Sequence, residues 1–283
     1  MTVCVSVKVH DCLVFAADSA SSLGGIDANG EPYVVNVWNH GNKVFNLYKG
    51  MPLAAMTCGL GNMGPASIGN LAKDFRWQIT NGDDSIKIDP KHYTVQEVAE
   101  KARAFFDERF KSIEPPPPQP QFEFWVGGYG SNCDNAELWK VSILDATGAQ
   151  LEMVLDESMD GNVAWGGQPM AINRLLLGYD PRLMGILMNS GVEQKTAEEL
   201  LDVMRDELQT PLVHAAMPVS DAINLADFLV DLTKRYFAFL PGADIVGGAT
   251  DIATVTKHEG FKWIKRKHYY SSEFNPRETD HVS

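Results

Sequence analysis

Hydrophobic and polar positions alternate in a strand-like pattern at the start of the chain. Residues 3–9 switch between apolar and small polar side chains, and residues 13–17 form a continuous apolar run. Alternation is typical of a half-exposed strand, whereas an unbroken apolar run is typical of a strand covered on both faces. The two segments, joined at Asp11-Cys12, therefore predict a buried hairpin.

The segments that follow also favour strands. Residues 21–32 combine several glycines with Asn29 and Pro32, which predicts a long loop before a strand over residues 33–38. Residues 43–48 and 52–59 predict a second hairpin that turns at Lys49-Gly50.

Helical spacing begins at Gly64-Pro65, where a proline suited to a first turn precedes apolar residues at helical intervals, and it returns in residues 94–113. Prolines 115–118 and 120 form a stiff connector that ends this helix. The remaining expected elements are strands at 122–127, 138–144, 151–155 and 163–165, helices at 169–177, 181–188, 193–208 and 219–240, and a strand pair at 252–256 and 261–265.

The order of these elements predicts the fold class. Strands, helices, strands, helices and strands follow one another in blocks, whereas a doubly wound α/β fold would alternate strictly. Two antiparallel sheets packed face to face, with helices on both outer faces, satisfy the block order. The sequence thus predicts an α+β fold of the four-layer αββα type, in a single domain over residues 1–270 with a polar tail at 271–283.

Composition narrows the classes of function. The 24 basic and 37 acidic residues give a formal charge of −13 without a long Lys/Arg run, which argues against a nucleic-acid or membrane partner. No apolar run reaches the roughly 18 to 20 residues of a membrane span, and we expect no leader segment, so a cytoplasmic protein is expected. The 4 cysteines lack CxxC spacing and predict reduced core thiols, with no metal and no cofactor.

Thr2 is the first candidate for chemistry. Methionine aminopeptidase removes Met1 when the second side chain is small, which would leave Thr2 with both a hydroxyl and a free α-amine. An α-amine titrates near about 7.7 to 8.0, so part of it is neutral at pH 7 and can take the hydroxyl proton as the oxygen attacks a carbonyl.

Three further signals are weak one by one. Asp18 and Ser19 follow the apolar run 13–17, where such a pair most often caps a turn. Lys43 opens a strand, and lysines there are usually only solvated. Gly59 ends the next strand, where glycine most often serves a turn but also lets a substrate approach a backbone N–H.

The series of these motifs along the chain is more specific than any one of them. It resembles the catalytic β-subunits of the proteasome family of N-terminal nucleophile (Ntn) hydrolases, and within it the beta-proteobacterial proteasome homologue. The motifs that carry the resemblance are Thr2, Phe-Ala-Ala-Asp18-Ser19, Lys43-Val44-Phe45, Met56-Thr57-Cys58-Gly59, Val163-Ala164-Trp165-Gly166-Gly167 and Asp244-Ile245-Val246-Gly247-Gly248. The resemblance implies a four-layer αββα Ntn-hydrolase sandwich.

The resemblance also implies roles for individual residues. Thr2 would be the nucleophile and, through its amine, the base. Lys43 would lower the pKa of that amine, and Asp18 would hold Lys43 in place. The N–H of Gly59 would be the oxyanion donor, a role typically worth about 2.7 to 4 kcal/mol. Thr57 would line the first specificity pocket and favour small or neutral side chains.

The sequence departs from the family at its auxiliary positions. Gly166 stands where the family usually has a serine, and Val246 replaces the serine before the late Gly-Gly pair. The late aspartate is shifted by one residue, to Asp244. Ser19, Asp244 and Gly166 therefore remain auxiliary candidates, and loss of the two hydroxyls weakens the case for efficient peptide hydrolysis.

Three hypotheses follow. The chain is a threonine peptidase acting on peptides or unfolded protein within stacked rings, two rings of seven being expected; or it is a catalytically silent ring subunit; or it is an Ntn amidase acting on a small amide. Thr2 favours the first, and the missing hydroxyls favour the second. The sequence leaves open whether an ATPase unfoldase partner exists.

Overall fold

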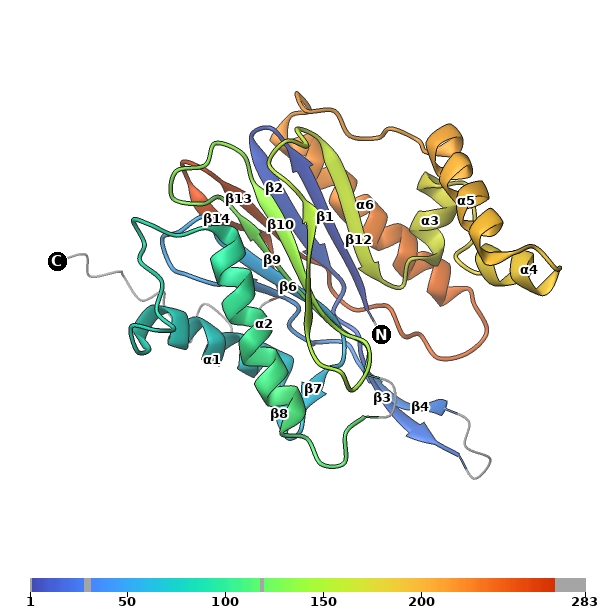
Figure 1. The fold of residues 1–283 in the computed structure, drawn as a ribbon, viewed down its shortest axis with the longest axis horizontal. Helices are drawn as coiled ribbons and strands as arrows, with labels where there is room; N and C mark the ends of the chain where they lie inside the picture. Colours follow the sequence, from blue (N-terminus) through green and yellow to red (C-terminus); the bar gives the residue numbers. More distant parts are fainter. Residues whose placement is uncertain (1, 28–31, 118–119, 268–283) are drawn as a thin grey trace.

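Two five-stranded antiparallel sheets form the centre of the computed structural model (Figure 1). The structure describes residues 2–27, 32–117 and 120–267. Met1 and the expected tail at 271–283 lie outside the described residues, as does the middle of the glycine-rich segment, 28–31.

The first sheet carries the N-terminus. Its strands, in spatial order, are β12 (Asn162–Gly167), β1 (Val3–Val9), β2 (Cys12–Ala17), β13 (Asp251–Thr256) and β14 (Gly260–Lys265). Every residue of β1 and β2 is buried, although β1 alternates in polarity. The predicted buried hairpin is confirmed, with Cys4 opposite Ala17.

The second sheet contains the predicted second hairpin. Its strands, in spatial order, are β11 (Gln150–Leu155), β10 (Glu137–Ile143), β9 (Phe122–Gly128), β6 (Leu53–Gly59) and β5 (Val44–Asn46). Val44 lies opposite Met56, and Gly59 ends β6 opposite Phe122. The strand expected directly after the proline connector is thus confirmed as β9.

Helices cover the two sheets on different sides. α1 (Ile68–Asn81) and α2 (Val95–Lys111) share a hydrophobic cluster with β5, β6, β9 and β10. α3 (Met170–Leu176) and α6 (Val219–Ala238) share another with β1 and β2. A third cluster joins residues of both sheets, among them Phe15 of β2 and Trp125 of β9. The result is an α+β fold with several antiparallel sheets.

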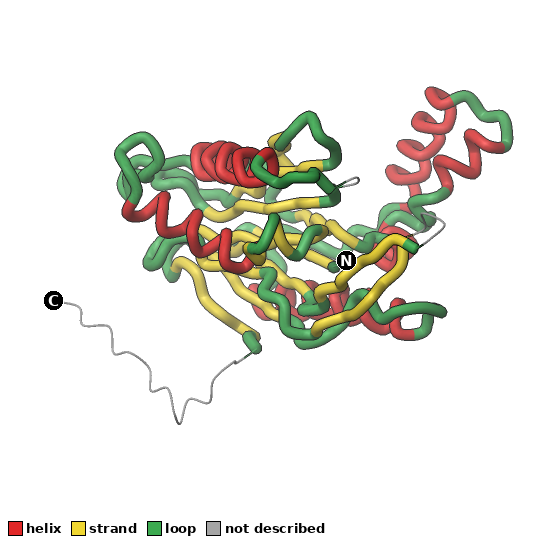
Figure 2. Tube along the Cα trace, turned by 90° about the horizontal axis from the view of Figure 1, so that it is seen from below, coloured by secondary structure: helices red, strands yellow, loops and turns green. Residues whose placement is uncertain are grey.

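The two remaining helices, α4 (Leu183–Asn189) and α5 (Gln194–Leu208), stand apart from this core. α4 has no buried residue, and α5 buries only Ala197. Figures 1 and 2 both show this helical pair projecting from the rest of the chain. Within the described residues, no helix is both long and apolar enough to span a membrane.

Two expectations from the sequence are wrong. Most of the glycine-rich segment is not a loop, because β3 (Ser21–Ile26) pairs with β4 (Pro32–Trp38) in a hairpin. A Cβ on Gly25 would lie 2.9 Å from the Tyr33 ring, so glycine here permits close packing rather than a turn. Pro65 does not open α1. It lies in the turn between β7 (Asn62–Met63) and β8 (Ala66–Ser67), and α1 is capped by Ser67.

Candidate active site

A buried ion pair joins two of the residues singled out in the sequence. Lys43 Nζ lies 2.7 Å from Asp18 Oδ1, and their side chains are 7% and 0% exposed. Asp18 also accepts hydrogen bonds from the backbone N–H groups of Val3 (3.1 Å), Ala20 (3.1 Å) and Gly247 (3.0 Å). These four donors match the acceptor capacity of a carboxylate. The Asp18 carboxylate is therefore held in one position, in contact with Lys43.

Thr2 lies directly beside this pair. It is 3% exposed, and its carbonyl oxygen accepts a hydrogen bond from the Gln168 backbone N–H at 2.8 Å. Its neighbour Val3 donates to Asp18. A Cβ on Gly167, whose φ is +82°, would lie only 1.9 Å from the Thr2 carbonyl oxygen. Glycine at this position lets β12 close over the start of β1 and hold Thr2 in place.

The end of β6 forms the facing wall. The Thr57 backbone N–H donates to the Lys43 carbonyl oxygen at 2.9 Å, which ties β6 to the lysine. Thr57 Oγ1 donates to the Glu123 carbonyl oxygen at 2.9 Å. Gly59 has φ +91°, and a Cβ there would lie 1.8 Å from the Gln121 carbonyl oxygen. Only glycine fits this close approach of two strands.

A cleft of about 370 Å³ brings these residues together. Thr2, Lys43, Thr57 and Gly59 all line it, together with the first turn of α1. Asp18 lies behind Lys43 and does not line the cleft. Asp244 is exposed and does not line the cleft; its carboxylate lies beside Gly247, 3.5 Å from the position that a Cβ would take there.

Ser19 belongs to a second buried ionic cluster that sequence reasoning missed. Lys267 Nζ donates to Ser19 Oγ at 2.7 Å and forms a salt bridge with Asp251. Since an ammonium group only donates, Ser19 Oγ accepts from Lys267 and gives its own hydrogen to the Ala249 carbonyl oxygen at 2.5 Å. The Ser19 backbone N–H donates to the Gly247 carbonyl oxygen at 2.9 Å. Ser19 thus holds the loop whose Gly247 N–H binds Asp18.

Replacing Lys267 with methionine should destabilise the fold. Asp251 would be left buried without its cation, and breaking a buried pair in this way costs about 3 to 5 kcal/mol. The double variant Lys267→Met/Asp251→Asn removes both charges and should recover most of the loss. Urea denaturation at one fixed protein concentration measures both. Equal stability of the single variant and the wild type would contradict this ionic role.

The same pair predicts a pH dependence. Burial lowers the pKa of Lys267, and Asp251 offsets part of that shift. Between this lowered pKa and the ordinary lysine value near about 10.4, the unfolded chain binds more protons than the folded one, so stability rises with pH. The unfolding free energy of the wild type should therefore rise relative to the double variant as pH increases towards 10.4.

Gly166 lies where a side chain would meet close neighbours. A Cβ on Gly166 would lie 2.5 Å from Glu123 Oε2 and 2.9 Å from a ring carbon of Trp125. Glu123 Oε2 accepts hydrogen bonds from Trp125 Nε1 (2.9 Å) and from Cys58 Sγ (3.0 Å). A hydrogen bond with Cys4, followed by burial, raises the pKa of the Cys58 thiol well above its usual range. Cys58 therefore stays a neutral donor, and the Glu123 carboxylate occupies the space beside Gly166.

Placing a serine at position 166 should therefore lower the stability of the fold. Overpacking typically costs about 1 to 3 kcal/mol. Gly166→Ser/Glu123→Ala should lose less stability than the sum of its single changes. The control is Gly185→Ser, because a Cβ there meets nothing within 4 Å. Thermal unfolding of the four variants tests this, and a fully stable Gly166→Ser would refute the clash.

Val246 is the residue before the Gly247 loop contact. Its side chain is fully buried and belongs to the hydrophobic cluster of β1, β2, α3 and α6. Val246 thus anchors the loop that contains Gly247 through apolar packing, while Ser19 and Lys267 anchor it through hydrogen bonds.

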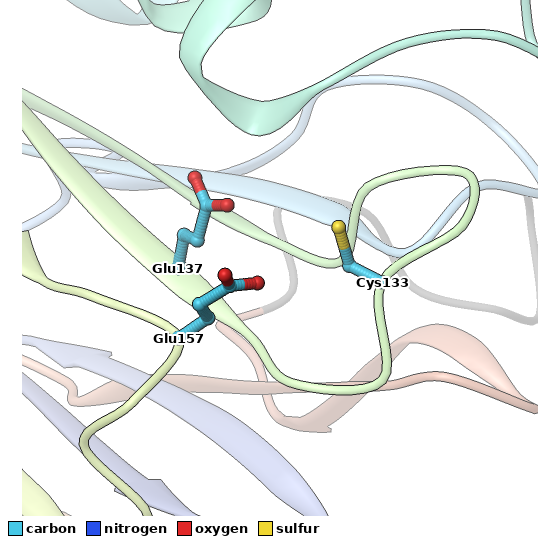
Figure 3. Close-up of side chains that lie close together, drawn as sticks. All are labelled: Cys133, Glu137 and Glu157. Carbon is cyan, nitrogen blue, oxygen red and sulfur yellow. The ribbon is translucent and has the colours of Figure 1, made fainter.

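One side-chain cluster outside the cleft has donor atoms spaced for a metal (Figure 3). Candidate ligand atoms of Cys133, Glu137 and Glu157 lie within 4.8 Å of one another. Glu137 already accepts a hydrogen bond from Trp139 Nε1 at 2.8 Å, and burial raises the pKa of the Cys133 thiol. Both features oppose metal binding. All four cysteines are free thiols.

The cluster is also remote from Thr2. Lys8 lies near the far end of β1 and interacts with two residues of the cluster. Burial lowers the pKa of Lys8, while the nearby charges of Glu137 and Glu157 act to raise it. At about 3.3 Å per residue, Lys8 and Thr2 are on the order of 20 Å apart along this strand. The cluster therefore takes no part in chemistry at Thr2.

Comparison with solved structures finds this architecture in bacterial complexes. The helical assembly of the Anbu complex from Pseudomonas aeruginosa matches with a TM-score of 0.54 and 15% identity, covering 96% of this chain and 90% of that one. The Anbu (Gly-1) mutant from Hyphomicrobium sp. strain MC1 matches with a TM-score of 0.55 and 12% identity, covering 94% of this chain and 86% of that one.

At such identities the likeness to Anbu establishes the fold alone. No protein-family model and no curated protein matches the sequence. The chemistry of this chain therefore has to be argued from its own residues.

Proposed function

We propose that this chain is an N-terminal threonine hydrolase of the proteasome type, a bacterial proteasome homologue that cleaves peptide bonds. The observation that carries the proposal is the convergence of Thr2, the buried Lys43–Asp18 pair and Gly59 at one cleft. These groups match a nucleophile, a nearby cation and an oxyanion donor.

The mechanism follows from these positions. Once Met1 is removed, the neutral amine of Thr2 accepts the hydroxyl proton while Oγ1 attacks the carbonyl carbon of the substrate. The negative charge that develops on the carbonyl oxygen is stabilised by the N–H of Gly59. The amine, now protonated, gives its proton to the leaving nitrogen. Water then attacks the acyl ester with the same amine as base, which regenerates Thr2.

The direct test is covalent capture of Thr2. The purified protein is treated with a peptide epoxyketone, which reacts with both the hydroxyl and the amine of an N-terminal threonine, and intact mass is recorded before and after. The first spectrum shows whether Met1 is absent, and the second whether one inhibitor mass is added per chain. A chain that lacks Met1 and stays unmodified would contradict the proposal.

The proposed architecture is the four-layer αββα sandwich of the Ntn hydrolases. The three hydrophobic clusters support it, since two of them join a sheet to helices and the third joins the two sheets. Each sheet is then covered on both faces, which accounts for the continuous apolar run of β2.

We also propose self-assembly, with rings of seven as the expected form. One structural neighbour is a helical assembly, so an open helical arrangement is the alternative for this chain. Exposed apolar residues on α4 and α5 support a surface for self-contact: Ile186, Met188, Leu200 and Val203. Light scattering distinguishes a closed ring of fixed mass from a mass that grows with concentration, and a monomer would overturn the proposal.

A second candidate is a subunit that assembles without turnover. The exposed Asp244 and the Glu123 carboxylate beside Gly166 favour it, because groups that would orient the Thr2 amine are displaced or absent. The third hypothesis, an amidase for a small amide, shares the Thr2 chemistry. An unmodified Thr2 would favour the silent subunit, whereas modification by small electrophiles but not by peptide ones would favour the amidase.

A further inference from the structure

The cleft beside Thr2 continues along α1. A second hollow of about 230 Å³ shares two lining residues with it, Asn42 and Lys73. Lys73 lies on the part of α1 that follows the first turn, and that first turn lines the cleft itself. A peptide bound at Thr2 and extended along α1 would therefore pass Lys73. The two hollows together are called the α1 groove below.

The α1 groove is basic in an acidic protein. The chain has 37 acidic and 24 basic residues. Among the described residues, no carboxylate lines the cleft, and the only one in the second hollow, Asp251, is paired with Lys267. The cations along the groove, apart from the paired Lys43, are Lys49, Lys73, Arg76 and Arg266.

These cations have no carboxylate partner within the described part of the chain. Lys49, Lys73 and Arg76 form no salt bridge there, and the Arg266 guanidinium lies over the Trp263 ring at 4.7 Å from its centre. Asp74 is the nearest acid in sequence. It accepts a hydrogen bond from Asn70 at 3.4 Å and lines a third hollow together with Lys49, Lys73 and Arg76, without forming a salt bridge to any of them within the described residues. Within the described residues, no salt bridge neutralises the positive charge of Lys49, Lys73, Arg76 or Arg266.

We infer that the α1 groove binds acidic peptides, and that Lys73 is a residue that determines this specificity. The inference rests on the proposed function, since it names the class of peptide that the cleft would receive. A field of one sign along a groove attracts the opposite charge and repels its own. Thr57 and Gly59 line the cleft beside Thr2, and Lys73 adds selection by charge further along α1. Because Lys73 is exposed, one such contact should change affinity by up to about fivefold.

Binding to the Thr2→Ala chain tests the inference without hydrolysis. The probes are three hexapeptides that alternate alanine with glutamate, glutamine or lysine, each labelled with a neutral dye and followed by fluorescence anisotropy. We expect the glutamate peptide to bind about fivefold or more tightly than the glutamine peptide, and the lysine peptide to bind most weakly. Raising the salt from about 0.05 M to about 0.3 M should shrink these differences in affinity, because salt screens the attraction between exposed charges.

Lys73→Gln should remove most of the preference for glutamate over glutamine. The matched control is Lys195→Gln, which deletes the same charge on α5, at a residue that lines neither hollow. This control should keep the preference. Equal affinity for the glutamate and glutamine peptides would overturn the inference, and so would an equal loss of preference in the two variants.

The outcome is separable from that of the proposed function. If the wild-type chain binds the glutamate peptide through Lys73 but never forms a covalent adduct at Thr2, the groove inference is supported and the hydrolase proposal is contradicted. If the chain is modified at Thr2 but binds all three peptides equally, the hydrolase proposal is supported and the groove inference is contradicted.

Discussion

Replacing Thr2 with alanine should abolish covalent capture by the epoxyketone and lower peptide hydrolysis by about 10⁴-fold or more, as expected for loss of a nucleophile. Thr2→Ser keeps the hydroxyl and should still be captured. Alanine and serine are both small, so Met1 should be removed from both variants and the amine is retained. Intact mass and turnover of a fluorogenic peptide measure the two effects. Undiminished capture of Thr2→Ala would place the nucleophile elsewhere.

A bulky residue at position 2 removes the hydroxyl and the free amine together. Thr2→Leu should retain Met1, and the peptide bond on its nitrogen removes the base as well as the hydroxyl. Because Thr2 is buried at the start of β1, its stability has to be checked by thermal unfolding alongside Thr2→Ala. Turnover at the wild-type rate in this variant would rule out the proposed amine base.

Much of the site could be predicted because each residue ends or begins a strand. Asp18 follows β2, Lys43 precedes β5, and Gly59 ends β6. Once these strands are placed in two antiparallel sheets, their ends meet at one edge. The Lys43–Asp18 contact spans 25 residues, and the family resemblance supplied the pairing that periodicity alone leaves open.

Two other features had no local signal. Lys267 is separated from Ser19 by 248 positions, and nothing in the sequence around it distinguishes a buried lysine from an exposed one. Glu123 alternates with apolar residues in β9 as a solvent-facing residue would, yet its carboxylate is bound by Trp125 and Cys58. Both depend on tertiary packing, which a strand or helix pattern does not encode.

The errors in secondary structure share a physical cause. Glycine and proline predict a loop in residues 21–32 and a helix start at Pro65. In β3, glycine instead permits close contact with Tyr33 across the hairpin. At Pro65 the proline lies in a short turn, and the cap of α1 is the Ser67 hydroxyl, which accepts from the Asn70 N–H at 3.2 Å. In each case the glycine or proline fits a β-hairpin as well as it fits the loop or helix start that the sequence predicts.

Lys43→Ala should lower kcat/KM by about tenfold at neutral pH, as expected when the pKa of the catalytic base rises by about one unit. The proposed base works only when the Thr2 amine is neutral, so kcat/KM should rise with pH along a limb set by the pKa of that amine. A nearby cation favours the neutral amine. Removing Lys43 deletes that cation and leaves the Asp18 carboxylate unpaired, and both changes favour the protonated amine.

The acid limb of Lys43→Ala should therefore move to higher pH, by about one unit, which corresponds to about 1.4 kcal/mol between the two protonation states. Lys43→Arg keeps the charge in a different geometry, so it should restore part of the pH position and little of the rate. Lys91→Ala, at an exposed lysine that lines none of the hollows described above, is the control and should leave the limb unchanged. Single-turnover acylation across pH 5 to 10 covers the usual amine range near about 7.7 to 8.0. A limb that stays at the same pH in Lys43→Ala would exclude an amine base tuned by this lysine and would leave Lys43 a purely structural partner of Asp18.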